Sequence, residues 1–506
     1  MKNSKVYAID FGTTFSEYGY LKEDGRPEVI KNPSGRRKLR TAVWFKDGSG
    51  KKFGSTAARA GPVHPDSVLQ EFKPDFDDTG TEFKVDGKKL KPVEVAELFY
   101  GHMKSRIKEA TGETPDRVVI TIPAYFHDIG YQVLKRGAEA AGFKIERILR
   151  EPASAAVGYA INNPLNHKET VLVYDFGGGT FDASILEVTE ENDSPKFDTV
   201  GNRGRTNLGG KDFTVKIVKK VFAKEFRNEH GTDPTDKPEV RAEWLRRAED
   251  MKKSLSENKS DIDLIQAEKK QVSVELTRDK FEGLIEPEVE ETLDITEKLL
   301  DETGKDRSSI DRLVLVGGTT RIPLIQKEVS NFIGLEPEKG VDPDLAVITG
   351  AILVGGAKGN QVIRNKKGVR VPLLASEVRD VTSRGIGIKA VNPDTGEEYH
   401  EVLIPKGEPL EAKGSKPFYP DRDDADTVSI TILEGDSEDI DDCRKLQEDY
   451  ELEISTSKKK EEVKIEISLI VNKDGLIEVM AETEYGDRMR EEFTNPNILD
   501  KGDSNG

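Results

Sequence analysis

The chain has 506 residues, of which 35% are hydrophobic and 34% are charged, and its formal net charge is −18. This length predicts two to four domains with large cores, while the acidic balance argues against electrostatic binding to nucleic acid or to a membrane surface, and no apolar run reaches the roughly 18–20 residues of a membrane span. Because Cys443 is the only cysteine and the N-terminus has no apolar signal segment, we expect no internal disulfide, no cysteine-rich zinc site and a cytoplasmic protein.

The first part of the chain alternates β-branched runs with helical patterns, which predicts an α/β domain over 1–365 built on a largely parallel sheet. The expected strands are 6–9, 117–122, 171–174 and 312–316, and the expected helices are 92–110, 132–142, 240–257 and 280–303.

The pattern changes after a linker at 366–382. Short alternating runs separated by turn residues predict an antiparallel β-sandwich or barrel over 383–497, and the residues at 498–506 are typical of a disordered tail. The expected strands are 386–391, 428–433, 450–455, 464–471 and 476–481.

A weak repeat divides the first domain. V-Y-A-I-D-F-G-T-T-F, with its aspartate at Asp10, is echoed by V-L-V-Y-D-F-G-G-G-T-F, with its aspartate at Asp175. Each is a strand that ends in Asp, followed by a Gly/Thr turn and a second strand. The repeat predicts a duplicated domain with a cleft between its halves.

The chemistry of these turns favours a phosphate site. Glycines let backbone N–H groups approach phosphate oxygens, and Thr13, Thr14 and Thr180 add hydroxyl donors. A carboxylate just before each turn suits a hydrated Mg²⁺. The alternative is a pair of ordinary β-hairpins whose glycines serve only the turn, which becomes the weaker interpretation because the two motifs occupy matching places.

A third turn, L-V-L-V-G-G-T-T-R-I-P at 313–323, would bring backbone close to a flat ligand such as adenosine. Taken alone it is better explained as a strand-to-helix turn with Arg321 on the surface.

These motifs resemble those of the seventy-kilodalton heat-shock, DnaK-type chaperones, in family order and over about 1–497. The C-terminal part adds D-V-T, G-I-G-I, I-T-I-L-E-G and D-G-L-I-E-V. The motifs that carry the resemblance in the first part are I-D-F-G-T-T at 9–14, I-P-A-Y-F at 122–126, R-E-P-A-S-A-A at 150–156, D-F-G-G-G-T-F-D at 175–182, L-G-G-K-D-F at 208–213, G-G-T-T-R-I-P at 317–323 and D-P-D at 342–344.

The resemblance implies an actin-like, ribonuclease-H-like duplicated ATPase domain and a β-sandwich peptide domain, with ATP or ADP, Mg²⁺ and, as a candidate further ion, K⁺. It implies catalytic roles for Lys73, Glu151, Asp10, Asp175 and Thr180, and a Mg²⁺ shell arranged by Asp10, Asp175 and Asp182. The nucleotide contacts that it implies are Gly12, Thr13, Thr14, Gly177, Gly178, Gly179, Thr180, Glu249, Lys252, Lys253, Ser256, Gly317, Gly318, Arg321 and Asp344. For each carried-over charge, a plain surface residue is the alternative.

The sequence departs from the family pattern at residues that contact the ligand and at residues that couple the two domains. Phe15 replaces a Tyr or Asn, Lys253 replaces an Arg that stacks on adenine, and Tyr131 replaces an Arg that works with Pro123 to relay the nucleotide state. The Leu-rich linker becomes S-E-V-R at 376–379. We therefore expect hydrolysis to be retained and coupling between the domains to be weak.

The leading hypothesis is an ATP-dependent chaperone that binds extended apolar segments of unfolded polypeptides and acts in protein folding and the stress response, with a J-domain co-chaperone and a nucleotide exchange factor as candidate partners. Because the chain ends soon after the β-domain, we expect a lidless member. The alternatives are a weakly hydrolysing or non-hydrolysing relative that serves as co-chaperone or exchange factor and, less favoured, a filament-forming actin-like protein or a sugar kinase. Candidates for a peptide pocket are Leu403, Ile404, Phe418, Val428 and Ile430.

Overall fold

The structure is a computed structural model of the chain. It describes residues 5–46, 50–78, 80–126, 128–162, 168–191, 194–364, 368, 378–379, 382, 384–392, 395–408, 411–446, 449–455, 458–472 and 477–492. The predicted tail at 498–506 lies outside these residues, as does most of the predicted linker.

The first half of the α/β region is built on a mixed sheet whose main path is β11-β10-β1-β2-β3. β1 pairs in parallel with β10 and antiparallel with β2, so the N-terminal hairpin occupies the middle of the sheet. The strands are β1 (Val6–Phe11), β2 (Phe15–Leu21), β3 (Pro27–Val29), β10 (Arg117–Ile122) and β11 (Lys144–Arg150).

The second half repeats this arrangement in the order β17-β12-β13-β14-β18. β12 pairs in parallel with β17 and antiparallel with β13, as β1 does with β10 and β2. The two sheets therefore place Asp10 and Asp175 at equivalent strand ends. The strands are β12 (Glu169–Phe176), β13 (Thr180–Glu191), β14 (Ser194–Thr206), β17 (Arg312–Val316) and β18 (Val378–Arg379).

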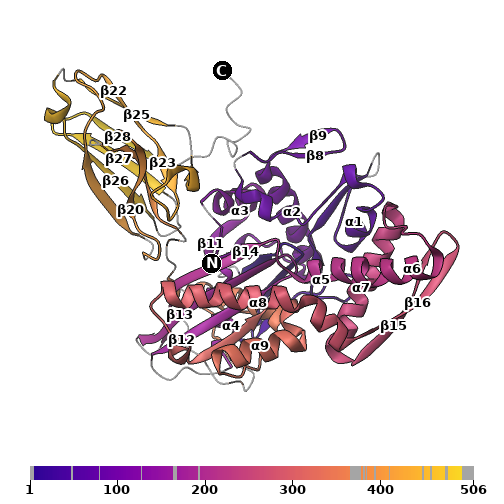
Figure 1. The fold of residues 1–506 in the computed structure, drawn as a ribbon. Helices are drawn as coiled ribbons and strands as arrows, with labels where there is room; N and C mark the ends of the chain where they lie inside the picture. The colour runs from indigo at the N-terminus through magenta and orange to yellow at the C-terminus, as the bar shows by residue number, and fades with distance from the viewer. Residues whose placement is uncertain are drawn as a thin grey trace.

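Helices cover both sheets, and the four predicted helices are present with ends shifted by a few residues (Figure 1). The apolar run at 346–357 forms the buried helix α10 (Ala346–Lys358), which packs on β1, β2 and α4 (Glu151–Ala160). No described helix is both long and apolar enough to cross a membrane. The predicted helices correspond to α2 (Pro92–Thr111), α3 (Asp128–Ala140), α7 (Pro238–Glu257) and α8 (Arg278–Glu302).

Beyond residue 382 the described secondary structure is antiparallel strands and short 3-10 turns, which agrees with the predicted change from α/β to all-β. Sheets in the orders β20-β19-β23-β24 and β21-β26-β27-β28 contribute to one apolar core, together with the pair β22-β25. In Figure 1 this part stands beside α3, in yellow. Apart from β23, the strands of these two sheets are β19 (Ile386–Val391), β20 (Glu398–Ile404), β21 (Lys413–Phe418), β24 (Arg444–Lys445), β26 (Ile465–Val471), β27 (Ile477–Thr483) and β28 (Arg488–Glu492).

The prediction of one continuous strand over 428–433 is wrong. The run at 428–433 is divided into β22 (Thr427–Ile430) and β23 (Ile432–Glu434), which belong to different sheets. β22 pairs with β25 (Tyr450–Glu453), whereas β23 pairs with β19. Thr431 lies at the break, and its hydroxyl donates to the Asp449 carboxylate at 2.6 Å. Alternation along the run could not reveal a change of pairing partner.

Candidate nucleotide site

The first glycine turn joins β1 to β2 directly after Asp10. A Cβ on Gly12 would lie 2.1 Å from the carbonyl oxygen of Phe15, so this backbone approach requires glycine. The Thr41 hydroxyl donates to the Gly12 carbonyl at 2.7 Å and fixes the turn from outside. The strand order therefore holds Thr13 and Thr14 at the end of the central strand.

The second turn joins β12 to β13 directly after Asp175. The N–H of Gly177 donates to the Thr180 carbonyl at 3.0 Å and closes the turn. Backbone N–H groups of Gly210 and Lys211 donate to the carbonyls of Gly177 and Gly178 at 3.1 and 2.9 Å. The start of α5 (Gly210–Ile217) therefore supports the turn from behind.

The two turns meet face to face. The Thr14 hydroxyl oxygen lies 2.6 Å from the point that a Cβ on Gly178 would occupy, so a side chain at residue 178 would displace Thr14. This hydroxyl is buried and has no hydrogen-bond partner within the described chain. A buried unpaired hydroxyl costs free energy, and an oxygen-rich anion between the turns would satisfy it. The donors at this place therefore fit a phosphate group.

Each turn also carries a pair of carboxylates. Asp10 lies directly opposite Glu17 in the β1–β2 register, and Asp175 lies directly opposite Asp182 in the β12–β13 register. The sequence pointed to Asp182 but not to Glu17, although both follow the turn aspartate by seven residues. Glu17 is 4% exposed and makes no ion pair within the described chain.

The surroundings of these acids favour their neutral forms. Burial, with the nearby Glu151 carboxylate, raises the pKa of Asp10 to about 7 and that of Asp175 to about 8. Burial and the Asp175 carboxylate also raise the pKa of Asp182. A cation at this place would stabilise the charged carboxylates.

The donor set agrees with a hydrated Mg²⁺ better than with a metal enclosed by protein. Within the described ranges, no three His, Cys, Asp or Glu side chains gather into a group that could hold a metal ion. Mg²⁺ usually keeps several waters and binds through one or two carboxylates together with phosphate oxygens. Asp10 and Asp175, next to the unsatisfied Thr14 hydroxyl, fit that pattern.

Lys73 and Glu151 form a short ion pair beside these acids. The Lys73 Nζ lies 2.7 Å from the Glu151 Oε1, and the Lys73 side chain is 1% exposed. Lys73 directly precedes the 3-10 turn η2 (Pro74–Asp77), and Glu151 is the first residue of α4. Elements 78 residues apart in sequence thus bring together two predicted catalytic side chains.

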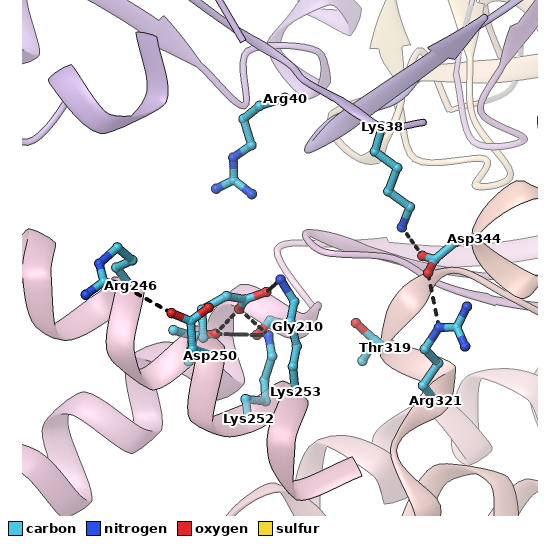
Figure 2. A network of polar contacts seen from close by, with 12 residues as sticks. Lys38, Arg40, Gly210, Arg246, Asp250, Lys252, Lys253, Thr319, Arg321 and Asp344 are labelled. Carbon is cyan, nitrogen blue, oxygen red and sulfur yellow. Dashed lines mark hydrogen bonds and ion pairs between the residues drawn. The ribbon is translucent and has the colours of Figure 1, made fainter. Parts of the chain in front are cut away.

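The predicted adenosine contacts on α7 form a polar network (Figure 2). The buried Lys252 ammonium donates to the Gly210 carbonyl at 2.6 Å and to the Thr214 hydroxyl at 2.9 Å. Burial alone would raise the pKa of Glu249, but Lys252 and Lys253 lower it to about 2. The Lys253 side chain is 61% exposed, whereas Ser256 is partly buried one turn further along the helix. Lys252 is therefore occupied by protein oxygens, and Lys253 is the more accessible cation.

The glycine pair after β17 faces the same space. Gly317 has φ 82°, and a Cβ there would lie 2.4 Å from the Phe176 carbonyl oxygen. A Cβ on Gly318 would lie 2.7 Å from the Asp344 carboxylate. Arg321 pairs with Asp344 at 3.1 Å. Asp344 also pairs with Lys38, which sequence reasoning did not single out. In Figure 2 Lys38 reaches down to Asp344 while Arg40 points into the open space above α7.

The five candidate residues of the peptide pocket differ in how deeply they are buried. Leu403, Ile404 and Ile430 are buried in the apolar core of the β region. Phe418 and Val428 are partly buried and pack against that core. Of the five candidates, these two have apolar surface left for a ligand.

Comparison with known families identifies a family that this chain matches. The family described as Hsp70 protein matches residues 73–503 of this chain. The match covers most of the α/β region and the whole described β region.

Proposed function

This chain belongs to the Hsp70 protein family, and we propose that it is a chaperone that binds and hydrolyses Mg-ATP and binds extended apolar segments of unfolded polypeptides. The observation that carries the proposal is the meeting of the two glycine turns, where the unsatisfied Thr14 hydroxyl faces Gly178. The proposal includes an actin-like duplicated ATPase domain at 1–365, a linker at 366–382 and a β-sandwich peptide domain at 383–497.

In this proposal the glycine turns bind the phosphates. Backbone N–H groups of the segments at 12–14 and 178–180, with the threonine hydroxyls, would supply the hydrogen bonds, since the Gly177 N–H already donates to the Thr180 carbonyl. Asp10, Asp175 and Asp182 would hold a hydrated Mg²⁺. The ion supplies charge neutralisation, which phosphoryl transfer to water requires more than covalent chemistry. Lys73 stabilises the charge that develops on the transferred phosphoryl group.

In this proposal Glu151 orients the attacking water. Its carboxylate accepts from Lys73 at 2.7 Å, which fixes one oxygen. The other oxygen is available for a water, and the side chain keeps 18% of its surface exposed. Lys73 thereby acts twice, on the phosphate and on the group that positions the nucleophile.

The adenosine would lie between α7 and the glycine pair after β17. Lys253 and Arg321 supply cations on the two sides, and Glu249 and Asp344 supply acceptors for ribose or base donors. A lysine is a poorer planar partner for adenine than an arginine, so we expect weaker stacking than an arginine would give.

The peptide would bind at the β region as an extended segment held by backbone hydrogen bonds. Phe418 and Val428 are the two pocket candidates with exposed apolar surface. Client polypeptides are the proposed partners, with a J-domain co-chaperone and a nucleotide exchange factor.

Two measurements test this function. Titration of the protein with Mg-ATP should show binding, and single-turnover assays should show release of phosphate. Asp175→Asn should reduce Mg²⁺-dependent binding, whereas Asp250→Asn, which removes a 66% exposed carboxylate paired with Arg246 along α7, should not. ATP binding without hydrolysis would select the co-chaperone or exchange-factor alternative, and absence of ATP binding would refute the proposal.

A further inference from the structure

Lys211 lies beside both glycine turns and has no role in the proposal so far. Its Nζ would be 3.6 Å from a Cβ on Gly179, and the Thr13 Cγ2 would be 3.7 Å from the same point. One ammonium group therefore borders the second turn where a threonine of the first turn reaches it. Lys211 is the second residue of α5, whose backbone supports that turn.

The anion that Lys211 faces comes from the other half of the α/β region. The Lys211 Nζ lies 3.7 Å from the Glu71 Oε2, well beyond the roughly 2.7–2.9 Å of a charge-assisted hydrogen bond. The Arg40 guanidinium approaches the other Glu71 oxygen at 4.0 Å. Both contacts are loose and partly solvated, so either cation can leave Glu71 at little cost.

The backbone of Glu71 has an uncommon conformation. Its φ is 56°, in the left-handed region that a non-glycine residue adopts only at a cost. It lies two residues before Lys73, on the segment that enters η2. One carboxylate thus lies between two loosely paired cations, Lys211 and Arg40, where a phosphate could take its place.

Two other cations of the site, Lys73 and Lys252, are already committed to protein partners. Lys73 is buried against Glu151, and Lys252 donates to the Gly210 carbonyl and the Thr214 hydroxyl. The Lys211 side chain is 37% exposed, and Glu71 is its one ion-pair partner among the described residues. Four acids, Asp10, Glu17, Asp175 and Asp182, lie opposite one another on the strands that flank the two turns, so a further cation there is favourable for an entering phosphate chain.

We propose that Lys211 binds the phosphate chain of a nucleoside di- or triphosphate, and that Glu71 occupies its ammonium when no nucleotide is bound. The inference rests on the proposed nucleotide site and names a binding residue and a competing anion within it. Phosphate entry then exchanges one anion for another at Lys211, so Glu71 and the nucleotide oppose each other.

The test compares nucleotide affinities of the full chain by calorimetry. Lys211→Gln should weaken ATP and ADP binding by about tenfold, which is 1.4 kcal/mol, and should leave adenosine binding unchanged because adenosine has no phosphate. Lys211→Arg should restore most of the affinity. Lys220→Gln removes the same charge from an exposed position in the next segment and should change nothing. Glu71→Gln should tighten ATP binding severalfold, because it removes the competing carboxylate.

The outcomes separate this inference from the function on which it rests. If the natural chain binds no ATP, both are refuted. If it binds ATP and Lys211→Gln binds equally well, Lys211 alone is refuted. If Glu71→Gln weakens ATP binding as Lys211→Gln does, the ion pair between Lys211 and Glu71 only stabilises the contact between the two halves of the α/β region. The proposed exchange of anions is then refuted.

Discussion

The Arg444 guanidinium of the β region contacts Asp77 of the α/β region, with its Nη1 3.8 Å from the Asp77 Oδ2. A second N–H of Arg444 donates to the backbone carbonyl of Asp77. Asp77 ends the four-residue turn η2, which begins after Lys73. The same carboxylate accepts from the Gly130 N–H at 3.1 Å, and Ile129 beside it is buried with the β-region core. The β region therefore rests on the turn that positions the proposed catalytic lysine.

We expect Arg444→Ala to loosen this contact. A partly buried hydrogen bond to a charged group contributes about 1.5–3 kcal/mol, so η2 and α3 should exchange amide hydrogens faster. Hydrogen exchange followed by mass spectrometry over 72–78 and 128–140 would measure it. Lys445→Ala is the matched control, because Lys445 pairs with Asp449 inside the β region at 2.9 Å. Equal exchange in both variants would mean that the Arg444 contact does not hold the two parts together.

We expect Lys73→Ala to leave ATP binding largely intact and to slow hydrolysis by about 10²-fold, the size of one lost preorganised charge contact. Single-turnover phosphate release measures this step. Lys144→Ala, at a lysine whose side chain is 76% exposed, should hydrolyse at the natural rate. An unchanged rate in Lys73→Ala would remove Lys73 from the mechanism.

The nucleotide-free protein should lose stability as the pH rises from about 4 to about 8. Burial, with Glu151 and Asp10 nearby, raises the pKa of Asp175 from 3.8 to about 8, so in this window the unfolded chain has released a proton that the folded chain keeps. One such proton costs about 1.4 kcal/mol per pH unit. In Asp175→Asn this part of the loss should disappear. Apparent Tm values without Mg²⁺ or nucleotide would show the two proteins diverging with pH, and parallel curves would contradict the prediction.

We expect ATP to change peptide affinity by less than about tenfold, or 1.4 kcal/mol. The linker places Val378–Arg379 in parallel pairing with Phe197 and Asp198 at the edge of β14, so backbone docking is compatible with a charged residue there. Glu377 and the apolar stretch V-P-L-L-A at 371–375, which contains Leu373 and Leu374, lie outside the described residues. Tyr131 is buried in the core of the first half. An arginine at this position would carry a positive charge that tyrosine lacks, and the weak coupling that we expect follows in part from this loss.

Peptide titrations with and without ATP decide the coupling. A hundredfold loss of peptide affinity on adding ATP would contradict weak coupling. If Leu373→Asp and Leu374→Asp then abolished that loss, the apolar stretch before the paired segment would be its cause.

The sequence by itself determined the features that depend on near neighbours. Alternation and helical periodicity predicted α2, α3, α7 and α8, and the repeat around Asp10 and Asp175 placed both glycine turns at equivalent strand ends. Even Glu17 was readable, because it follows Asp10 by the same seven residues that separate Asp182 from Asp175. The conformation of a strand, a tight turn and a second strand depends mainly on residues close together in sequence. The local pattern of residues is therefore enough to predict such a unit.

Only the tertiary structure decided which distant side chains meet. Lys73 and Glu151 are 78 residues apart, and Asp77 and Arg444 are 367 residues apart. The division of 428–433 into β22 and β23 likewise depends on partners elsewhere in the chain. Such contacts arise when sheets and helices bury their apolar faces together, and the energy of that packing is shared among many residues of the core. The charges that meet at its edges, such as Lys211 and Glu71, are therefore placed by the fold and leave no periodic signal in the sequence.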